Sequence, residues 1–378
     1  MSPVAVYVHV PFCPSKCGYC DFNSYALSGE IVPQTVAAML TQIETSPFAG
    51  VPAKTIFFGG GTPTFLDEAS LMSILEAVMR VHPPIENCEI TSEANPGTVD
   101  ASKFRAMRAG GFNRISLGAQ SFLDSDLIAL ERVHKGGDIE RAFFAAREAG
   151  FDNVNLDLMF ALPNQTRRGW TTNLERALAM EPDHLSLYCL TIEPNTAFYR
   201  RHLRGELHLP DDDAQVAMYD ECVSRTAEKG YEAYEISNFA KPGRACQHNL
   251  EYWHAAPYLA YGPGAVGCLN DDLAKMAGRS GSIRYTNHKQ PRLYVEKMAL
   301  GSTTWLEEEA LTPETHEVER LMLGLRLAEG VELAERDEKV LRKLIDRQWI
   351  DLTGQRVTLT AEGRHFCSEV ALELAMTG

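Results

Sequence analysis

Short apolar runs alternate with longer amphipathic stretches through the first half of the chain. In residues 71–81 and 139–149, apolar side chains recur every three or four positions, which predicts helices with one buried face. The runs between such stretches are rich in β-branched residues and predict strands at residues 4–10, 55–58, 89–92, 114–117, 154–160 and 184–190. Strands that alternate with helices are typical of an α/β fold with a parallel sheet, either an open doubly wound sheet or a full or partial barrel.

The second half of the chain follows a different pattern. A long helix is predicted after Asp211, and residues 231–279 are then rich in glycine, proline and aromatic residues without a helical or strand period. From about residue 312 helical periodicity returns, followed by a hairpin that pairs residues 350–352 with 357–359 and by a last helix from Thr360. These changes predict three parts: an α/β domain at residues 1–230, an irregular region at 231–305 and a small α+β winged-helix-like domain at 306–378.

The charge balance limits the partners that the chain can have. Its 378 residues include 36 lysines and arginines and 51 aspartates and glutamates, which give a formal net charge of −15. Such a surface repels phosphate backbones and anionic lipids, so neither nucleic acid nor a membrane is expected as the principal partner. Residues 307–378 carry 9 basic and 16 acidic side chains, so the winged-helix-like domain is not expected to bind DNA either.

The sequence also predicts where the protein resides. It has no run of eighteen apolar residues that could span a bilayer, and residues 1–10 lack the basic start and small-residue cleavage site of a signal peptide. These features predict a cytoplasmic protein without direct membrane insertion. In a reducing compartment, an odd number of cysteines, here nine, points to metal binding or catalysis rather than to disulfides.

Three of the nine cysteines lie within eight residues, directly after the first predicted strand. Cys13, Cys17 and Cys20 form a CxxxCxxC array, which random placement would produce in fewer than about 1% of such chains. A structural zinc ion would need a fourth ligand, for which His9 or Asp21 is available, and a reactive thiol pair is another alternative. Three thiolates suit a 4Fe-4S cluster better, because each holds one iron and the fourth iron stays open to a ligand that is not protein. The isolated cysteines are expected to be small buried side chains: Cys88, Cys189, Cys222, Cys268 and Cys367.

Polar and small residues follow several of the predicted strands at the point where each strand ends. The second strand leads into Gly59-Gly60-Gly61-Thr62, a backbone that a ligand can approach closely, although a plain tight turn explains it equally well. Glu93 ends the third strand. Asp157 lies inside the apolar fifth strand, where an acid is costly unless it is paired, so it either contacts a ligand or pairs with Arg114 or Arg132. In a barrel, these strand ends would surround one site together with the cysteine loop.

The same stretches carry a family resemblance. In order along the chain they read Tyr7-Val-His-Val-Pro-Phe-Cys13, Gly59-Gly-Gly-Thr-Pro-Thr64, Glu93-Ala-Asn-Pro96, Gly118-Ala-Gln-Ser121, and Asp157 with Leu162-Pro-Asn-Gln-Thr166. The series resembles the ordered motifs of the oxygen-independent coproporphyrinogen III oxidase family of the radical S-adenosylmethionine (SAM) superfamily, over nearly the whole chain. The resemblance implies a partial (β/α)6 barrel, a 4Fe-4S cluster on Cys13, Cys17 and Cys20, and SAM on the open iron. It also implies a SAM site made of Tyr7, Tyr19, Gly60, Gly61, Thr62, Glu93, Gln120, Arg132 and Asp157.

Three features separate this chain from the oxidases of that family. The oxidase loop has a further cysteine where this chain has Phe22, and the oxidase has a substantial segment before its loop where this chain has twelve residues. The third feature, Cys246-Gln-His-Asn-Leu-Glu-Tyr-Trp253, has an HNxxYW signature and resembles the HemW-type branch, the haem chaperones. That resemblance implies haem as cargo, held by Cys246, His248 and Trp253, and an acceptor haemoprotein that receives it. Without the resemblance, His248 and Trp253 are typical core residues with polar tips.

The sequence departs from the chaperone pattern at two places. The usual Tyr-Gly-Leu-Pro after the buried acid is Phe160-Ala-Leu-Pro163 here, and Val266 stands where a histidine commonly follows the alanine of the glycine-rich stretch. The predicted function is haem binding and transfer, with no residue assigned to catalysis and with a flavodoxin or ferredoxin as the implied reductant. The alternative is a radical SAM oxidoreductase that decarboxylates coproporphyrinogen III.

Overall fold

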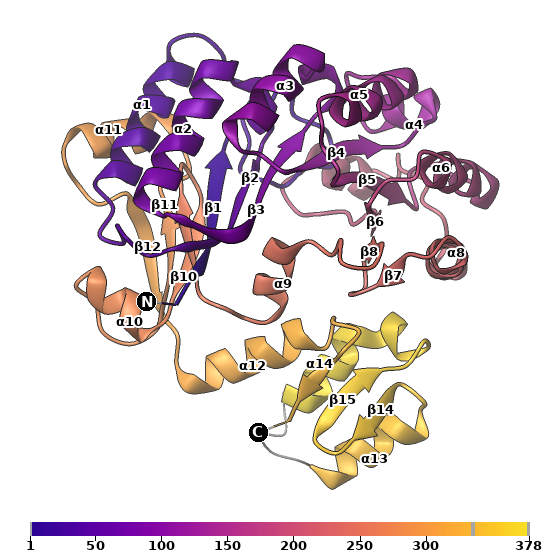
Figure 1. Ribbon diagram of the computed structural model, residues 1–378. Coiled ribbons are helices and arrows are strands. Elements are labelled where there is room, and N and C mark those ends of the chain that lie inside the picture. The colour runs from indigo at the N-terminus through magenta and orange to yellow at the C-terminus, as the bar shows by residue number, and fades with distance from the viewer. Residues whose placement is uncertain (1, 334–336, 376–378) are drawn as a thin grey trace.

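The computed structural model describes residues 2–333 and 337–375. Its centre is a run of six parallel strands that neighbour one another in sequence order (Figure 1): β1 (Val4–Val10), β2 (Ala53–Gly60), β3 (Pro84–Ala94), β4 (Arg114–Gln120), β5 (Val154–Phe160) and β6 (His184–Cys189). β1 is buried at six of its seven positions, as expected for a parallel strand that is covered on both faces. All six predicted strands are present, with β1 and β5 at the predicted bounds and β2 and β3 longer at both ends.

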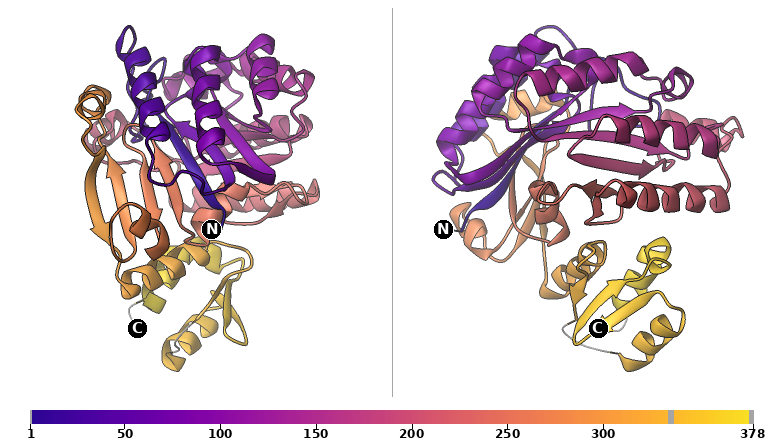
Figure 2. Two further views of the ribbon diagram at one scale, coloured as in Figure 1. Left: turned by 60° about the vertical axis from the view of Figure 1, so that its left-hand side comes forward. Right: turned by 45° about the vertical axis from the view of Figure 1, so that its right-hand side comes forward.

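The connections between these strands are helical: α1 (Ile31–Glu44), α2 (Glu68–Val81), α3 (Ala101–Gly110), α4 (Asp124–Ala129), α5 (Gly136–Glu148) and α6 (Arg167–Ala179). Figure 2 shows them along the outer side of the curved sheet. Side-chain caps start several of them, since Asp67 accepts the N–H of Ser70 and Asp100 accepts the N–H of Lys103. The predicted partial barrel is thereby confirmed, with the helical layer outside and the ends of the strands left open for a site.

The region 231–305, predicted to be irregular, is regular in the structure. It contains β7 (Glu232–Ala233), β8 (Asn238–Ala240), α9 (Gln247–Trp253), β9 (Tyr258–Tyr261), β10 (Val266–Leu269), α10 (Asp271–Met276), β11 (Ile283–Asn287) and α11 (Pro291–Ala299), and β12 (Trp305–Ala310) follows it. β9 pairs in parallel with β1, and β10, β11 and β12 continue the sheet antiparallel beyond it. At the other edge β8 and β7 extend the sheet past β6, so this part of the described chain contributes to one sheet of twelve strands, β1 to β12. Strands this short do not produce a recognisable period in the sequence.

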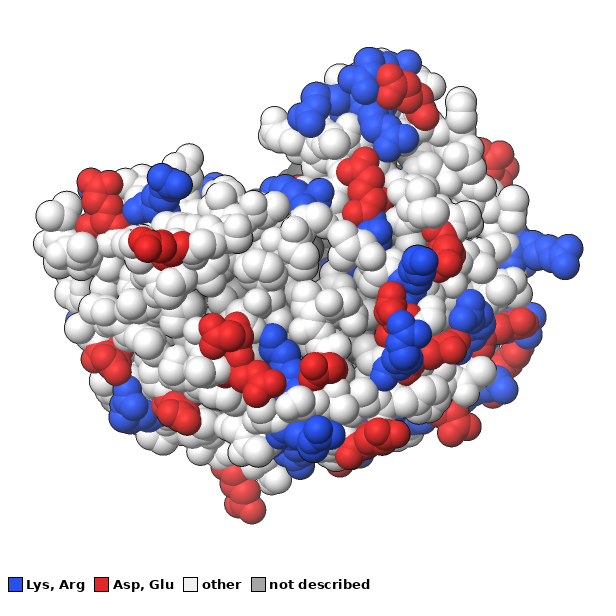
Figure 3. All heavy atoms as spheres, turned by 90° about the horizontal axis from the view of Figure 1, so that it is seen from above, with Lys and Arg blue, Asp and Glu red and all other residues white. Residues whose placement is uncertain are grey.

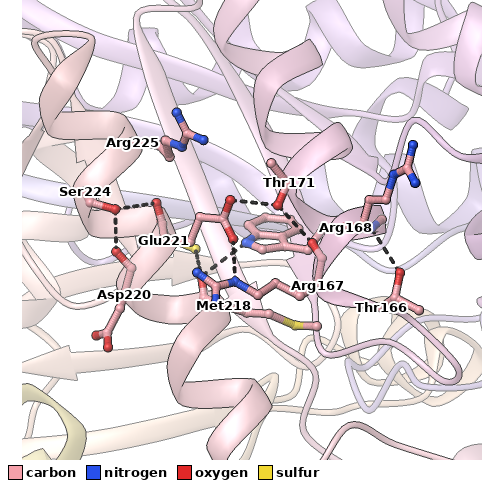
Figure 4. Close-up of polar contacts among 12 residues, drawn as sticks. Thr166, Arg167, Arg168, Thr171, Met218, Asp220, Glu221, Ser224 and Arg225 are labelled. Carbon is pink, nitrogen blue, oxygen red and sulfur yellow. Dashed lines mark hydrogen bonds and ion pairs between the residues drawn. The ribbon is translucent and has the colours of Figure 1, made fainter.

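Two helices follow β6, namely α7 (Ala197–Leu203) and α8 (Asp212–Glu228), and α8 packs against α6 through buried polar contacts (Figure 4). Glu221 on α8 is 7% exposed and accepts a hydrogen bond from Thr171 Oγ1 at 2.7 Å and another from Arg167 Nε at 3.3 Å. The indole N–H of Trp170 donates to the carbonyl of Met218 at 3.1 Å. These polar atoms have partners, which makes their burial between the two helices possible.

The C-terminal part forms a small domain of its own, drawn in yellow below the sheet in Figure 1. It contains α12 (Pro313–Gly324), β13 (Val331–Glu332), α13 (Glu338–Asp346), β14 (Ile350–Thr353), β15 (Arg356–Leu359) and α14 (Cys367–Ala375). The strands form an antiparallel sheet, and a separate apolar core includes Leu325, Leu344 and Val357. This is the α+β arrangement that the sequence predicts. In the residues that the structure describes, no helix is long and apolar enough to cross a membrane.

Candidate functional site

A cavity of about 510 Å³ opens at the carboxyl ends of the parallel strands. Its walls come from the loop after β1 and from the ends of β2 to β6. Figure 3 looks onto this end of the molecule, where the surface is hollowed and acidic and basic side chains are interspersed. The volume lies in the range of about 300–1,000 Å³ that is usual for small-molecule sites, so this end of the barrel is the candidate site.

The cysteine loop forms one wall of this cavity. Phe12 and Tyr25 pair across its base, and the N–H of Cys13 donates to the carbonyl of Tyr25 at 3.1 Å. Cys13, Cys17 and Cys20 all line the cavity, and all three are free thiols. Backbone bonds therefore hold the loop at its base and place the three sulfur atoms over the strand ends.

Side chains from elsewhere in the barrel face these thiols. Thr62 Oγ1 donates to Cys13 Sγ at 3.5 Å, and Arg132 Nη1 donates to Cys17 Sγ at 3.7 Å. Burial raises the pKa of the Cys13 thiol, while the Thr62 hydroxyl and the Arg132 charge oppose that rise. Burial disfavours the charge of Arg132 as well, but Tyr19 and Cys17 outweigh burial and raise its pKa, so it stays a cation. A cation and a hydroxyl donor favour the thiolate form that an iron cluster requires.

His9 connects the cysteine loop to the strands. Its Nε2 lies 2.9 Å from the carbonyl of Asn23, and because a carbonyl can only accept, Nε2 carries the proton and Nδ1 accepts from the Tyr7 hydroxyl at 3.0 Å. Burial lowers the pKa of His9 to about 4, so the imidazole is neutral. A Cβ at Gly60, whose φ is +103°, would lie 2.3 Å from this ring, so the position requires glycine. Both ring nitrogens are engaged, which removes His9 as a fourth zinc ligand.

Two carboxyl groups line the same cavity. Glu93 Oε2 accepts the N–H of Gly60 at 3.2 Å. Asp157 accepts from Ser116 Oγ at 3.0 Å and from Asn155 Nδ2 at 2.7 Å. Burial, together with the charge of Asp157, raises the pKa of Glu93 to about 8, and burial raises the pKa of Asp157 against its hydrogen bonds. Glu93 is therefore mostly protonated at neutral pH until a donor or cation enters the cavity.

Asp157 is held by a chain of neutral hydrogen bonds. Asn155 Oδ1 accepts from His184 Nδ1 at 2.7 Å, and His184 Nε2 accepts from the Tyr234 hydroxyl at 2.8 Å. Burial keeps the pKa of His184 well below its usual value, so this histidine is neutral. In the described part of the chain, neither arginine considered from the sequence forms an ion pair with Asp157. Hydrogen bonds from neutral groups thus orient Asp157 without an ion pair, which leaves its carboxyl group available to a ligand.

Eight of the nine residues that the resemblance assigns to SAM line this cavity: Tyr19, Gly60, Gly61, Thr62, Glu93, Gln120, Arg132 and Asp157. Tyr7 does not line it. Its ring lies one layer below, with its centroid 6.3 Å from those of Phe57 and His248, and its hydroxyl contacts His9. Tyr7 therefore supports the site from beneath in this conformation.

Sequence reasoning missed the contribution of the sixth strand. Tyr188 and Cys189 at the end of β6, and Thr191 and Glu193 just after it, also line the cavity. They could have been found from the sequence in the same way as Glu93, by taking the polar residues at and just after the end of each predicted strand. Cys189, predicted to be a buried apolar side chain, is exposed in the cavity wall because β6 ends there.

The HNxxYW segment lies at the opposite end of the barrel, as helix α9 beside the amino ends of the strands (Figure 1). Cys246 and His248 are 0% and 1% exposed. The Glu89 carboxylate accepts from Cys246 Sγ at 3.4 Å and from the N–H of His248 at 3.1 Å. His248 Nδ1 pairs with the Thr55 hydroxyl at 2.7 Å, and Nε2 pairs with the Tyr252 hydroxyl at 3.0 Å. As placed, neither ring nitrogen is free to bind iron.

Trp253, the third residue assigned to haem, has different surroundings. The Arg326 guanidinium lies 4.6 Å from its ring centroid, and the ring lines a second cleft, beside the C-terminal domain. The structure therefore separates Trp253, which borders open space, from Cys246 and His248, which are packed into the barrel.

The residues of the cysteine loop fit an iron-sulfur cluster with three protein ligands. Within residues 2–333 and 337–375, no three acidic, histidine or cysteine side chains are already drawn together as a metal cage. The three thiols nevertheless share one loop of bends and turns and face the same cavity, so they can converge without displacing a helix or strand. The adjoining glycines and acids fit a small ligand that carries hydroxyl and ammonium donors.

Two family models match this chain. The model of the Radical SAM superfamily matches residues 7–176, which contain the end of β1, the cysteine loop and strands β2 to β5. The model of the HemN C-terminal domain matches residues 311–366, which lie within the small domain. Most of the parallel-stranded barrel and most of the small C-terminal domain thus each match a known family.

Relatives match over nearly the full length. The "Heme chaperone HemW" of Bacillus subtilis (strain 168) is 36% identical over 380 residues, which cover 97% of each chain. The protein of the same name from Escherichia coli (strain K12) is 40% identical over 305 residues, 80% of this chain and 78% of that one. Among solved structures, coproporphyrinogen III oxidase (HemN) from Escherichia coli superposes with a TM-score of 0.84 at 22% identity, covering 100% of this chain and 91% of that one. At that identity the likeness establishes the fold.

Proposed function

This chain belongs to the HemW family of the radical SAM superfamily, and from that membership we propose that it binds haem and transfers it to acceptor haemoproteins. The observation that carries the proposal is the 36% identity, over 97% of both chains, with a protein named a heme chaperone. An identity spread over both the barrel and the C-terminal domain supports a shared function better than a match confined to one motif. The proposed location is the cytoplasm, and the proposed reductant is a flavodoxin or ferredoxin.

We further propose that Cys13, Cys17 and Cys20 hold a 4Fe-4S cluster and that the adjacent cavity holds SAM. When bound, the reduced cluster supplies a low-potential electron to the sulfonium of SAM. Glu93 and Asp157 would accept hydrogen bonds from hydroxyl or ammonium groups of this ligand, and the Arg132 cation would suit its carboxylate. Gly60 and Gly61 line this cavity at the end of β2, and a Cβ at either would clash with the His9 ring or with the backbone of Phe12.

The haem contacts assigned from the sequence are Cys246, His248 and Trp253. For His248 to bind iron, its ring would have to give up the bonds to Thr55 and Tyr252 and leave a fully buried position. Trp253 needs no such rearrangement because it already lines a cleft. Haem binding near Trp253 is therefore the part of this assignment that the geometry supports best.

The function is tested on the full-length chain, reconstituted anaerobically with iron and sulfide. We expect a brown protein whose EPR signal changes on adding SAM, stoichiometric haem uptake with a Soret band, and transfer of that haem to an apo-haemoprotein. The same preparation is assayed for conversion of coproporphyrinogen III with SAM and a reductant. Robust decarboxylation would replace the chaperone assignment by the oxidase alternative, and a colourless zinc protein would remove both.

A further inference from the structure

A second cleft, of about 370 Å³, lies between the barrel and the C-terminal domain. Figure 1 shows α12 passing beneath α9 and the lower ends of the neighbouring strands. An ion pair joins the two sides, in which Nη2 of Arg284 on β11 lies 2.6 Å from each carboxylate oxygen of Glu319 on α12. The cleft is therefore at the end of the barrel opposite to the cysteine loop, and its two walls come from different domains.

The walls of this cleft suit a flat aromatic ligand. Tyr258 and Tyr252 meet edge to face, with ring centroids 4.7 Å apart, and Trp253 continues this aromatic wall. Ala256 and Leu323 add small and aliphatic surface. Aromatic side chains of this kind offer faces and edges on which a large conjugated ring can pack.

The cleft also contains polar groups that lack a partner in the described chain. The indole N–H of Trp253 is buried and makes no hydrogen bond there. His316 lies on α12 with its side chain exposed at the cleft, and no hydrogen bond of its imidazole is formed within the described residues. Cys268 adds a half-buried free thiol from β10. A buried donor without a partner is costly, and Trp253 carries such a donor beside this cleft.

Building on the proposed chaperone function, we infer that this cleft is the haem site and that His316 is an axial ligand of the haem iron. His316 shares one face of α12 with Glu319 and Leu323, three and seven positions on, and all three line the cleft. In this arrangement an imidazole nitrogen of His316 would bind the iron, as in many haem proteins, while Trp253 would pack against the macrocycle. The open side of the cleft leaves an edge of the haem accessible, which transfer to an acceptor requires.

This location separates haem from the cysteine loop. The two sites lie at opposite ends of β1, which has seven residues and therefore spans roughly 20 Å. Haem in the cleft would not touch the cluster. Cys246 and His248 then act as the packed support beneath Trp253 rather than as iron ligands.

Hemin titration of the full-length chain tests the inference. We expect His316→Ala to weaken hemin binding by about tenfold or more and to shift the Soret maximum, because an axial ligand is lost. A second variant, Ala256→Trp, fills the cleft without removing a ligand and should also lower the affinity. The matched control is His254→Ala, which removes an exposed histidine outside the cleft that pairs with Glu329, and it should bind hemin like the wild type.

Cluster iron content and circular dichroism establish that each variant is folded. Weaker hemin binding in both His316→Ala and Ala256→Trp, with His254→Ala unchanged, supports the cleft. A wild-type affinity and Soret position in either folded variant overturns it while leaving the chaperone function intact. If the wild-type chain itself takes up no hemin, the proposed function fails and this inference fails with it.

Discussion

At the scale of single residues, Cys17 is the loop thiol that faces a buried cation, since Arg132 Nη1 lies 3.7 Å from its sulfur. A 4Fe-4S cluster with an open iron needs three protein thiolates, so Cys17→Ser is expected to abolish cluster assembly. Iron and sulfide analysis after anaerobic reconstitution measures this. Cys367→Ser, which alters a half-buried cysteine of the C-terminal domain, is the control and should keep the cluster. Full iron content in Cys17→Ser would exclude this ligand assignment.

Glu93 makes the site sensitive to pH. Its pKa of about 8 in the fold, against 4.5 for the unperturbed group, means that the folded chain binds more protons between these values than the unfolded chain does. The free energy of unfolding of the ligand-free protein should therefore fall as pH rises from about 4.5 to 8. The affinity for SAM should instead increase as pH rises, because the ionised Glu93 carboxylate accepts hydrogen bonds from the ligand. Its affinity should rise by up to about tenfold per pH unit below the pKa.

Glu93→Gln removes this titration, so calorimetric SAM affinities between pH 6 and 9 should become nearly independent of pH and be weaker at the upper end. Glu68→Gln, at the exposed start of α2, is the matched control and should keep the wild-type pH profile. If Glu93→Gln keeps that profile as well, another group controls the pH dependence.

At the scale of secondary-structure elements, Glu89 decides where α9 lies. Its carboxylate accepts the N–H groups of Gln247 and His248 at 3.0 and 3.1 Å, and its charge favours the cation of Arg114, which is 2% exposed. Glu89→Ala leaves the N–H groups of Gln247 and His248 without this acceptor, so the free energy of unfolding should fall by about 1–3 kcal/mol. Urea denaturation measures the loss. Glu44→Ala breaks an exposed ion pair with Arg80 and should cost less than about 1 kcal/mol; a similar loss in both variants would contradict this account.

The elements themselves were predictable to different degrees. Strands of the parallel core, such as β1 and β5, are buried on both faces, so the sequence shows them as mostly apolar runs, interrupted in β5 by Asn155 and Asp157. β12 reads Trp-Leu-Glu-Glu-Glu-Ala and is mostly exposed at the edge of the sheet, so no apolar period indicates a strand there. Its pairing with β11 decides its conformation, and that pairing depends on residues distant in the sequence.

At the scale of the whole molecule, Arg326 holds the C-terminal domain to the barrel. Its Nη2 lies 3.0 Å from Glu235 Oε2, whose side chain is fully buried, and its guanidinium lies over the ring of Trp253. Arg326→Ala should leave the Glu235 charge unpaired and loosen the docked domain, which faster limited proteolysis and faster hydrogen exchange in residues 311–375 would report. Arg356→Ala, which breaks an exposed pair inside the same domain, is the control. Wild-type rates for Arg326→Ala would mean that other contacts dominate the docking.

By itself, the sequence determined the parallel strands and the family, because apolar runs and ordered motifs can be read without a fold. It also predicts Cys13, Cys17 and Cys20 as the cluster ligands, from their spacing alone. The tertiary structure alone decided that Tyr7 lies beneath the cavity at the strand ends, that Cys246 and His248 are packed against Glu89, and that Trp253 shares a cleft with His316. Such neighbours come from segments far apart in the chain. The packing of all those segments together decides which side of a short helix faces the barrel and which side faces a second domain. A helix this short shows no apolar period in the sequence that would indicate the orientation.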